Sequence, residues 1–152
     1  MVKHRLRKGI NRFWELLDAE LVGPFQAVVY LHMAAAGIYG LAVAGGAPQA
    51  VEDSMGHVYN ALWLWLLPGV IVCLIGKLLR GDLTYAGMIF QLTGDTAAFG
   101  GLFIYFVATI NTSWWGKALF AVFLVAALAE CVILLIVRDV RRLYRVERRV
   151  RS

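Results

Sequence analysis

Residues 84–110 read TYAGMIFQLTGDTAAFGGLFIYFVATI, an apolar run that carries one carboxylate, Asp95, near its middle. At about 1.5 Å per residue, a helix of this run is roughly 40 Å long and can cross a hydrocarbon core of about 30 Å. The run therefore predicts a membrane-spanning helix with an acid at mid-depth. A carboxylate at that depth is costly unless it is paired, hydrated or protonated, so Asp95 marks a candidate functional site.

The whole chain has the composition of a membrane protein. Of its 152 residues, 61% are hydrophobic and only 16% are charged, and the mean hydropathy is +0.69. The charged residues gather towards the two ends and leave long uncharged runs between them. This pattern predicts a single membrane domain over residues 1–152. Cys73 and Cys131 lie inside apolar runs, so we expect two buried thiols rather than a disulfide framework.

Four apolar runs set the predicted architecture. We expect transmembrane helices at residues 24–45, 58–79, 84–110 and 115–137. Pro68 lies inside the second run and predicts a kink there, because proline lacks the backbone N–H of the helical hydrogen bond. The expected fold is all-α: a polytopic membrane protein built as a four-transmembrane-helix bundle.

Both ends of the chain are basic. Residues 1–22 place apolar side chains at i, i+3, i+4 spacing, with most basic residues off that stripe. This predicts an amphipathic helix in the membrane interface, with a solvated helix packed on a partner subunit as the alternative. Residues 138–152 hold seven arginines and a helical pattern of apolar residues, which predicts a basic C-terminal helical extension in the cytoplasm.

Anionic lipid headgroups are the partner expected for these basic ends, because they lie next to the membrane. Nucleic acid is not expected, since no base-reading motif accompanies the charge. The residues predicted to contact lipid are Lys3, Arg5, Lys8, Arg12, Arg138, Arg141, Arg142, Arg145, Arg148 and Arg149.

The distribution of lysine and arginine predicts the orientation. Five of these residues precede the first run, two, Lys77 and Arg80, lie at the turn from the second run to the third, and seven follow the fourth, whereas only Lys117 lies near an outer loop. The positive-inside rule therefore places both termini in the cytoplasm, with the protein in the cytoplasmic membrane.

Four polar side chains from three predicted helices fall at similar depth, about 10–16 Å from the cytoplasmic ends of their spans. They are His32, Gln91, Asp95 and Glu130. Two interpretations of this predicted layer stay open. The side chains could hold helices together through hydrogen bonds, or the carboxylates and the imidazole could form a proton or ion path.

The sequence contains no close metal-ligand motif, phosphate-binding loop or nucleophile motif, so we expect no metal site, no cofactor and no enzymatic activity. Gly87, Gly94 and Gly101 recur every seven positions on the third helix. Such a stripe permits close approach of a neighbouring helix. We expect it to bring Asp95 against the bundle or an oligomer interface, and to mediate assembly.

The four closely spaced spans, the basic amphipathic leader and the tail RDVRRLYRVERRVRS resemble the small four-span holin-like membrane proteins of actinobacterial phages. The resemblance covers the hydropathy of the whole chain and assigns no site residue. It implies a protein that oligomerises and permeabilises or depolarises the cytoplasmic membrane, so that a cell-wall hydrolase can act. Two alternatives remain: a non-lytic structural or accessory subunit of a membrane complex, and a small proton-coupled channel or transporter that uses Asp95, Glu130 and His32.

Overall fold

The computed structural model describes residues 22–79, 84–112 and 115–151. These residues form helices joined by short connections and contain no strand, which confirms the all-α prediction. The elements are α2 (Val22–Tyr39), η1 (Gly40–Ala44), α3 (Gln49–Gly69), α4 (Ile71–Leu79), α5 (Thr84–Asn111) and α6 (Trp115–Arg151). The predicted interfacial helix, with Lys3, Arg5, Lys8 and Arg12, lies outside the described residues except at Val22.

Four described segments are long and apolar enough to cross a membrane, one in each predicted run. They are Phe25–Ala44, Asn60–Leu78, Tyr85–Asn111 and Leu119–Arg148. The η1 element is a short π-helical turn that continues α2 to Ala44. The fourth helix continues beyond the predicted end of its span, because α6 runs without a break from Trp115 to Arg151.

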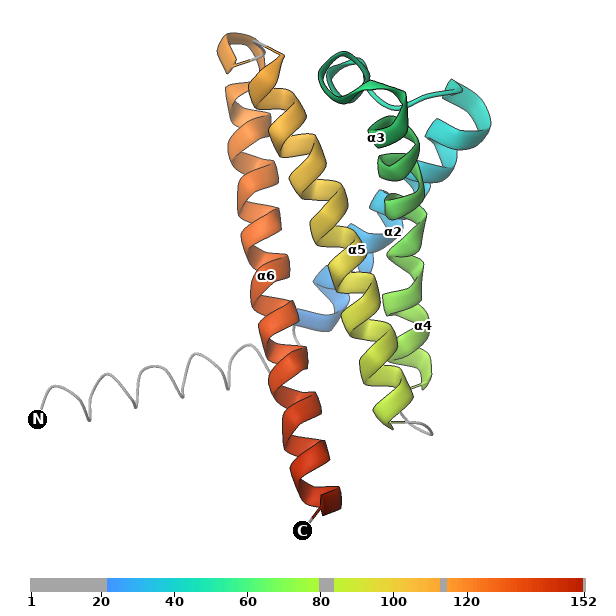
Figure 1. The fold of residues 1–152 in the computed structure, drawn as a ribbon, viewed down its shortest axis with the longest axis vertical. Coiled ribbons are helices and arrows are strands. Elements are labelled where there is room, and N and C mark those ends of the chain that lie inside the picture. The colour runs from blue at the N-terminus through green and yellow to red at the C-terminus, as the bar shows by residue number, and fades with distance from the viewer. Residues whose placement is uncertain (1–21, 80–83, 113–114, 152) are drawn as a thin grey trace, which may run out of the picture.

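Helix α5 is the central element (Figure 1). It packs against α6 on one side and against α3 and α4 on the other. Helix α2 crosses obliquely behind α5 and packs on α3 and α4. Helix α6 runs antiparallel to α5 and extends past its lower end. Among the described helices α6 packs chiefly against α5, and many of its large apolar side chains are exposed.

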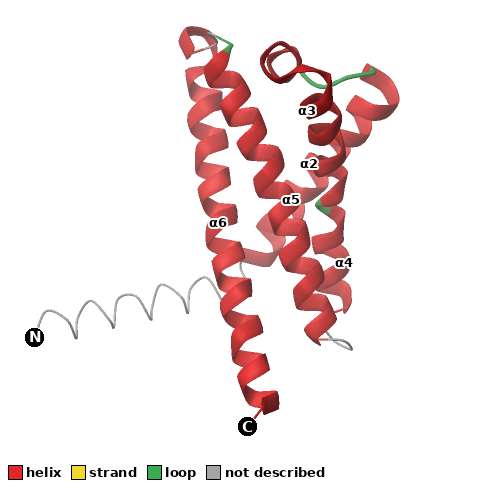
Figure 2. Cartoon of the chain, viewed as in Figure 1, coloured by secondary structure: helices red, strands yellow, loops and turns green. Residues whose placement is uncertain are grey.

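The second span is interrupted just after Pro68. Helix α3 ends at Gly69 and α4 begins at Ile71, and Figure 2 shows the short break between them. At the break the Val70 N–H points to the Leu67 carbonyl at 3.4 Å, and the Cys73 N–H donates to the Val70 carbonyl at 3.0 Å. Both bonds join residues three apart, whereas an α-helix joins residues four apart. Proline cannot supply an N–H to the helix, so the regular pattern of backbone hydrogen bonds is interrupted there.

The first part of α3 is a separate helical segment at one end of the described bundle. Residues 49–55 are helical and separate from the rest of α3 at Gly56, whose φ of 70° lies in the left-handed region that glycine tolerates. Val51 of this segment is fully buried and packs with Trp63 and Ala108. The Ala47 N–H nearby donates to Asn60 Oδ1 at 3.0 Å.

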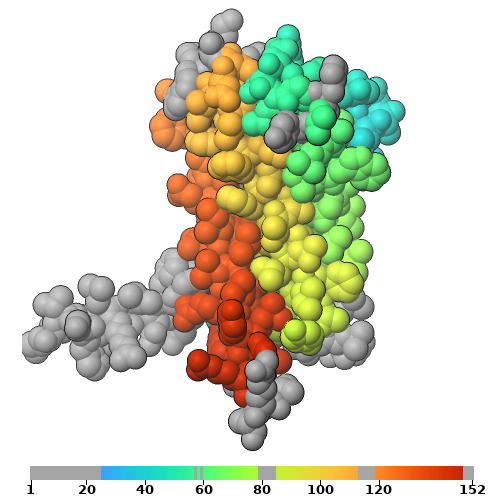
Figure 3. Space-filling view, in the orientation of Figure 1, coloured from blue at the N-terminus to red at the C-terminus, as the bar shows by residue number. Residues whose placement is uncertain are grey.

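The interior combines small residues with a few large ones. Its main cluster includes Tyr30, Ala34, Val70, Cys73, Ala98, Leu102, Ala129 and Val132. Large apolar side chains cover the outside, and Leu78 and Phe120 are more than four-fifths exposed. Figure 3 shows α6, α5 and α4 side by side on one continuous face. An apolar exterior of this kind is expected where lipid surrounds the helices.

Candidate functional site: a buried polar cluster around Asp95

Asp95 is fully buried and joins three helices. Its Oδ1 accepts hydrogen bonds from Gln26 Nε2 and Tyr30 Oη of α2, each at 2.7 Å. The Cys73 thiol of α4 donates to the same oxygen at 3.3 Å. We call Gln26, Tyr30, Cys73 and Asp95 the Asp95 cluster. It ties α2 and α4 to the central helix.

Local sequence explains how α2 reaches Asp95. Gln26 and Tyr30 are four residues apart and therefore share one face of the helix. Further along α2, Gly37 meets the second span closely, since a Cβ built there would lie 2.6 Å from Cδ of Pro68. This glycine allows α2 to cross tightly over α3 while its polar face meets α5.

Glycine also brings α4 against α5. A Cβ at Gly94 would lie 2.7 Å from the Cα of Cys73, so only glycine fits at this crossing. A Cβ at Gly76 of α4 would lie 2.7 Å from the Gly87 carbonyl oxygen, and one at Gly101 would lie 3.1 Å from Cδ2 of Leu67. Gly87, Gly94 and Gly101 thus lie in the contact of α5 with α3 and α4. The stripe is thus a helix-packing surface within the protomer, as predicted, and this contact occupies it, so that it cannot serve the assembly role that was also expected of it.

The structure does not bring the four predicted polar residues together. His32 is exposed, and its Nδ1 lies 2.8 Å from the Val28 carbonyl oxygen of its own helix. Glu130 is also exposed. Gln91 is 2% exposed, lies one turn from Asp95, and its Nε2 has no hydrogen-bond partner among the described residues. The four side chains do not form one layer, because residue counts along a span predict depth but not which face of the helix a side chain occupies, and His32 and Glu130 lie on exposed faces.

The tilt of α2 changes which residues meet. Gln26, near the start of α2, already contacts Asp95, which lies well inside α5. Sequence reasoning missed Gln26, Tyr30 and Cys73 as partners of Asp95. The available signal was the i, i+4 spacing of Gln26 and Tyr30, which places two polar side chains on one face of a mainly apolar helix.

Two oxygen atoms of the Asp95 cluster lack a hydrogen-bond donor among the described residues. They are Gln26 Oε1 and Asp95 Oδ2, both buried. A buried acceptor without a donor is destabilising by about 1–3 kcal/mol. Protonation of Asp95 would remove its charge and place a donor on the second oxygen. The cluster can therefore hold helices together and bind a proton.

A second buried polar group lies on α6. Arg138 is 6% exposed and Asp139 is 2% exposed, and Arg138 Nε lies 2.8 Å from Asp139 Oδ1. Arg142 Nη1 lies 4.0 Å from the same oxygen. Arg138 was predicted to contact lipid headgroups, and the structure corrects this, because its guanidinium is buried against a carboxylate. Asp139 was missed, since adjacent helical residues do not ordinarily face each other.

The other basic residues of the tail lie further along the same helix. Arg141, Arg145 and Arg148 are exposed, and Arg142 is partly buried. Arg145 Nε donates to the Arg141 carbonyl at 3.4 Å. Arg149 lies in α6. Their assignment to anionic lipid stays a prediction.

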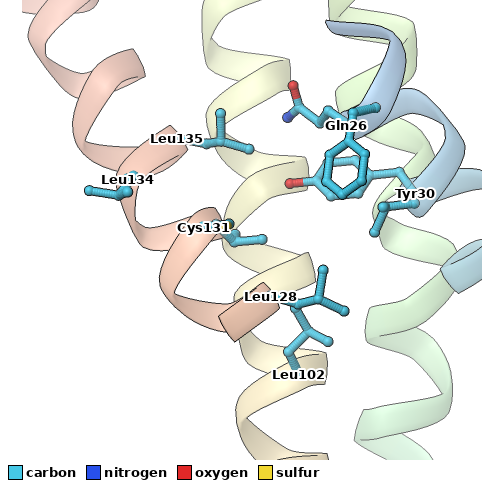
Figure 4. Close-up of a pocket in the computed structure, with 10 residues that line it drawn as sticks. Gln26, Tyr30, Leu102, Leu128, Cys131, Leu134 and Leu135 are labelled. Atoms are coloured by element: carbon cyan, nitrogen blue, oxygen red, sulfur yellow. The ribbon is translucent and has the colours of Figure 1, made fainter. Parts of the chain in front are cut away.

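An apolar groove of about 200 Å³ lies beside the Asp95 cluster, between α2 and α6 (Figure 4). Gln26 and Tyr30 line it from α2, and Leu128 and Cys131 line it from α6. Cys131 is exposed there, whereas Cys73 is buried, so the expectation of two buried thiols was half wrong. Within the described residues, no group of three His, Cys, Asp or Glu side chains is placed to hold a metal ion.

Comparison of the chain with protein-family models, curated proteins and solved structures finds no match. Function is therefore inferred from the geometry of the chain itself.

Proposed function

We propose that this protein assembles laterally in the cytoplasmic membrane, with both termini in the cytoplasm, and that the assembly permeabilises or depolarises the membrane as a holin does. The observation that carries the proposal is the exposure of Glu130 on α6, inside a segment apolar enough to span a bilayer. A carboxylate facing hydrocarbon is costly, and polar residues within spans ordinarily face other protein or water. Contact with another protomer or with enclosed water meets that requirement.

The interior of the protomer supports permeation between copies rather than through one copy. The polar residues of the Asp95 cluster donate to a single carboxylate oxygen. From Asp95 towards the end of α5 at Asn111, the buried residues Ala98, Leu102 and Ala108 are apolar, and the buried polar Thr109 lies only in the last turn. The Thr109 hydroxyl donates to the Tyr105 carbonyl of its own helix at 2.7 Å. A path through a protomer would need polar side chains along that half. His32 and Glu130 both lie on the outer surface, so they do not extend a path from Asp95.

The same exposed carboxylate also favours a second candidate, a non-lytic subunit of a larger membrane complex. In that case a different protein would cover Glu130. The two candidates differ in what purification and membrane potential show. A subunit co-purifies with other proteins and leaves the membrane potential unchanged, whereas an assembling lesion needs only this chain.

The test is inducible expression in a bacterium with a potential-sensitive dye. Glu52 provides a matched control for substitutions of Glu130, because it is an exposed acid outside the four candidate spans. We expect wild type and Glu52→Gln to collapse the potential after a delay, during which the protein accumulates. Normal potential and growth, with abundant membrane-inserted protein, would overturn the proposal.

A further inference from the structure

One flank of α6 carries a regular stripe of exposed side chains. Its members are Leu119, Phe123, Glu130, Ile133, Val137 and Tyr144, all exposed. Ala126 and Val140, both partly buried, lie between Phe123 and Glu130 and between Val137 and Tyr144. With them included, the spacing along the stripe alternates between four and three residues from 119 to 144. This is the a/d pattern of a coiled coil, sustained over more than three heptads.

The stripe lies away from the contact with α5. Ala129 and Val132 are buried in the core cluster, and successive residues of a helix are rotated by about 100°. Glu130 therefore lies on a different side of α6 from Ala129. Cys131 faces the groove towards α2 on the other flank. Among the described helices, α6 packs chiefly against α5, and this flank is left open.

Within the apolar part of the stripe, Glu130 is the only ionisable side chain. It occupies position a of the heptad, as Phe123 and Val137 do. A single polar residue at an a position is known to fix the register and oligomeric state of a coiled coil. Lipid tails offer Glu130 no hydrogen-bond partner. A second copy in the same orientation does, because a two-fold axis along the membrane normal brings each residue of the stripe opposite its counterpart.

We propose that this stripe is the contact surface between two copies of the chain, with α6 parallel to α6 and Glu130 hydrogen-bonded to Glu130 of the second copy. The carboxyl O–H of one copy donates the hydrogen bond, and a carboxyl oxygen of the other copy accepts it. The pattern of the stripe favours a left-handed crossing, because its period is shorter than that of a straight helix. This inference rests on the lateral assembly proposed above and names its surface.

Cysteine cross-linking, with an oxidant added to isolated membranes of cells that express the full chain, tests the surface. The background is Cys131→Ser, with Cys73 retained because it is buried. Phe123→Cys and Val137→Cys place thiols on the stripe. Leu124→Cys is the matched control, since Leu124 is 51% exposed, comparable to the 65% of Phe123, but lies off the stripe. We expect the two stripe variants to form disulfide dimers several-fold more efficiently than Leu124→Cys, because a and d side chains meet across a coiled coil.

Equal cross-linking at the three positions would overturn the proposal. So would preferential cross-linking of the wild-type chain through Cys131, which would place the contact on the groove flank. Disulfides between Val137→Cys and other proteins, instead of a second copy, would also contradict it.

The role of Glu130 is tested by adding a second substitution to the Val137→Cys chain. Glu130→Gln should keep dimer formation, because paired amides can still donate and accept. Glu130→Ala should reduce it several-fold at equal membrane insertion. Unchanged dimer formation in Glu130→Ala would overturn the carboxyl pairing. Cross-linking does not depend on membrane potential, so dimers without depolarisation reject only the lesion, and depolarisation without dimers rejects only this surface.

Discussion

Gly94 of α5 lies against the backbone of Cys73 in α4, and the next residue, Asp95, accepts a hydrogen bond from the Cys73 thiol at 3.3 Å. The close crossing and the buried carboxylate are thus parts of one arrangement. Without a side chain at position 94, the two helices approach closely enough for the thiol to reach Asp95. The same approach leaves Asp95 within reach of Gln26 and Tyr30.

Enlarging residue 94 should separate α4 from α5. A Cβ there would meet backbone atoms of Cys73, which cannot move aside as a flexible side chain would. We expect Gly94→Val to lower the free energy of unfolding in detergent by about 1–3 kcal/mol or more. Gly69→Ala is the control, because its Cβ would make ordinary contact with Ala97 at 3.4 Å. Equal thermal stability of the two variants would show that the crossing is looser than described.

Removing the carboxylate should destabilise the contact of α2 with the central helix. Asp95→Ala leaves the Tyr30 hydroxyl buried without its acceptor, at about 1–3 kcal/mol, and leaves the Gln26 amide with only the long contact of 3.5 Å to the Cys73 sulfur. Asp95→Asn keeps an acceptor oxygen and should lose less. Thermal unfolding in detergent compares the two. If Asp95→Ala were as stable as wild type, the cluster would not hold the helices together.

The two α2 donors should be energetically coupled, because both bond to the same oxygen. Tyr30→Phe should cost about 0.5–1.5 kcal/mol. A double-mutant cycle of Tyr30→Phe with Gln26→Leu should give an interaction energy of about 0.5 kcal/mol or more. Tyr39→Phe is a suitable control, since Tyr39 is 60% exposed on the same helix. Strict additivity would argue against a shared acceptor.

Arg138 and Arg148 should behave differently although both belong to the basic tail. Arg138→Ala removes the guanidinium whose Nε lies 2.8 Å from the carboxylate of buried Asp139, and breaking a buried ion pair in this way typically costs about 3–5 kcal/mol. Arg148 is exposed, so Arg148→Ala should change stability by less than about 0.5 kcal/mol. The contrast appears in unfolding of the purified protein. If both substitutions changed the free energy of unfolding by the same small amount, the pairing of Arg138 with Asp139 would not stabilise the fold, and Arg138 would again be a candidate for lipid contact.

Hydropathy alone predicted the four apolar spans and the helical class, because length and apolar composition decide whether a helix can cross a bilayer. Pro68 marked the place where the second span breaks, since its missing N–H has a local effect. The partners of Asp95 could not be predicted by counting residues from the membrane edge. Their meeting depends on the tilt of α2, which tertiary packing at Gly37 sets.

The burial of Arg138 was also missed from sequence. Arg138 follows the most apolar part of α6 and was grouped with the tail, yet α6 continues as one helix and buries it against Asp139. A hydropathy window does not reveal such a pair. The exposed heptad on α6 is visible in the sequence once α5 is known to occupy only the other side of the helix.

The dependence of leakage on protein density in reconstituted vesicles tests the central claim most directly. If copies must associate to permeabilise the membrane, the initial rate of dye or ion release should rise more steeply than linearly with the protein-to-lipid ratio. Glu130→Ala should shift the curve to higher protein density. A strictly linear dependence, which a single protomer would give, or intact vesicles at every density, would contradict the account.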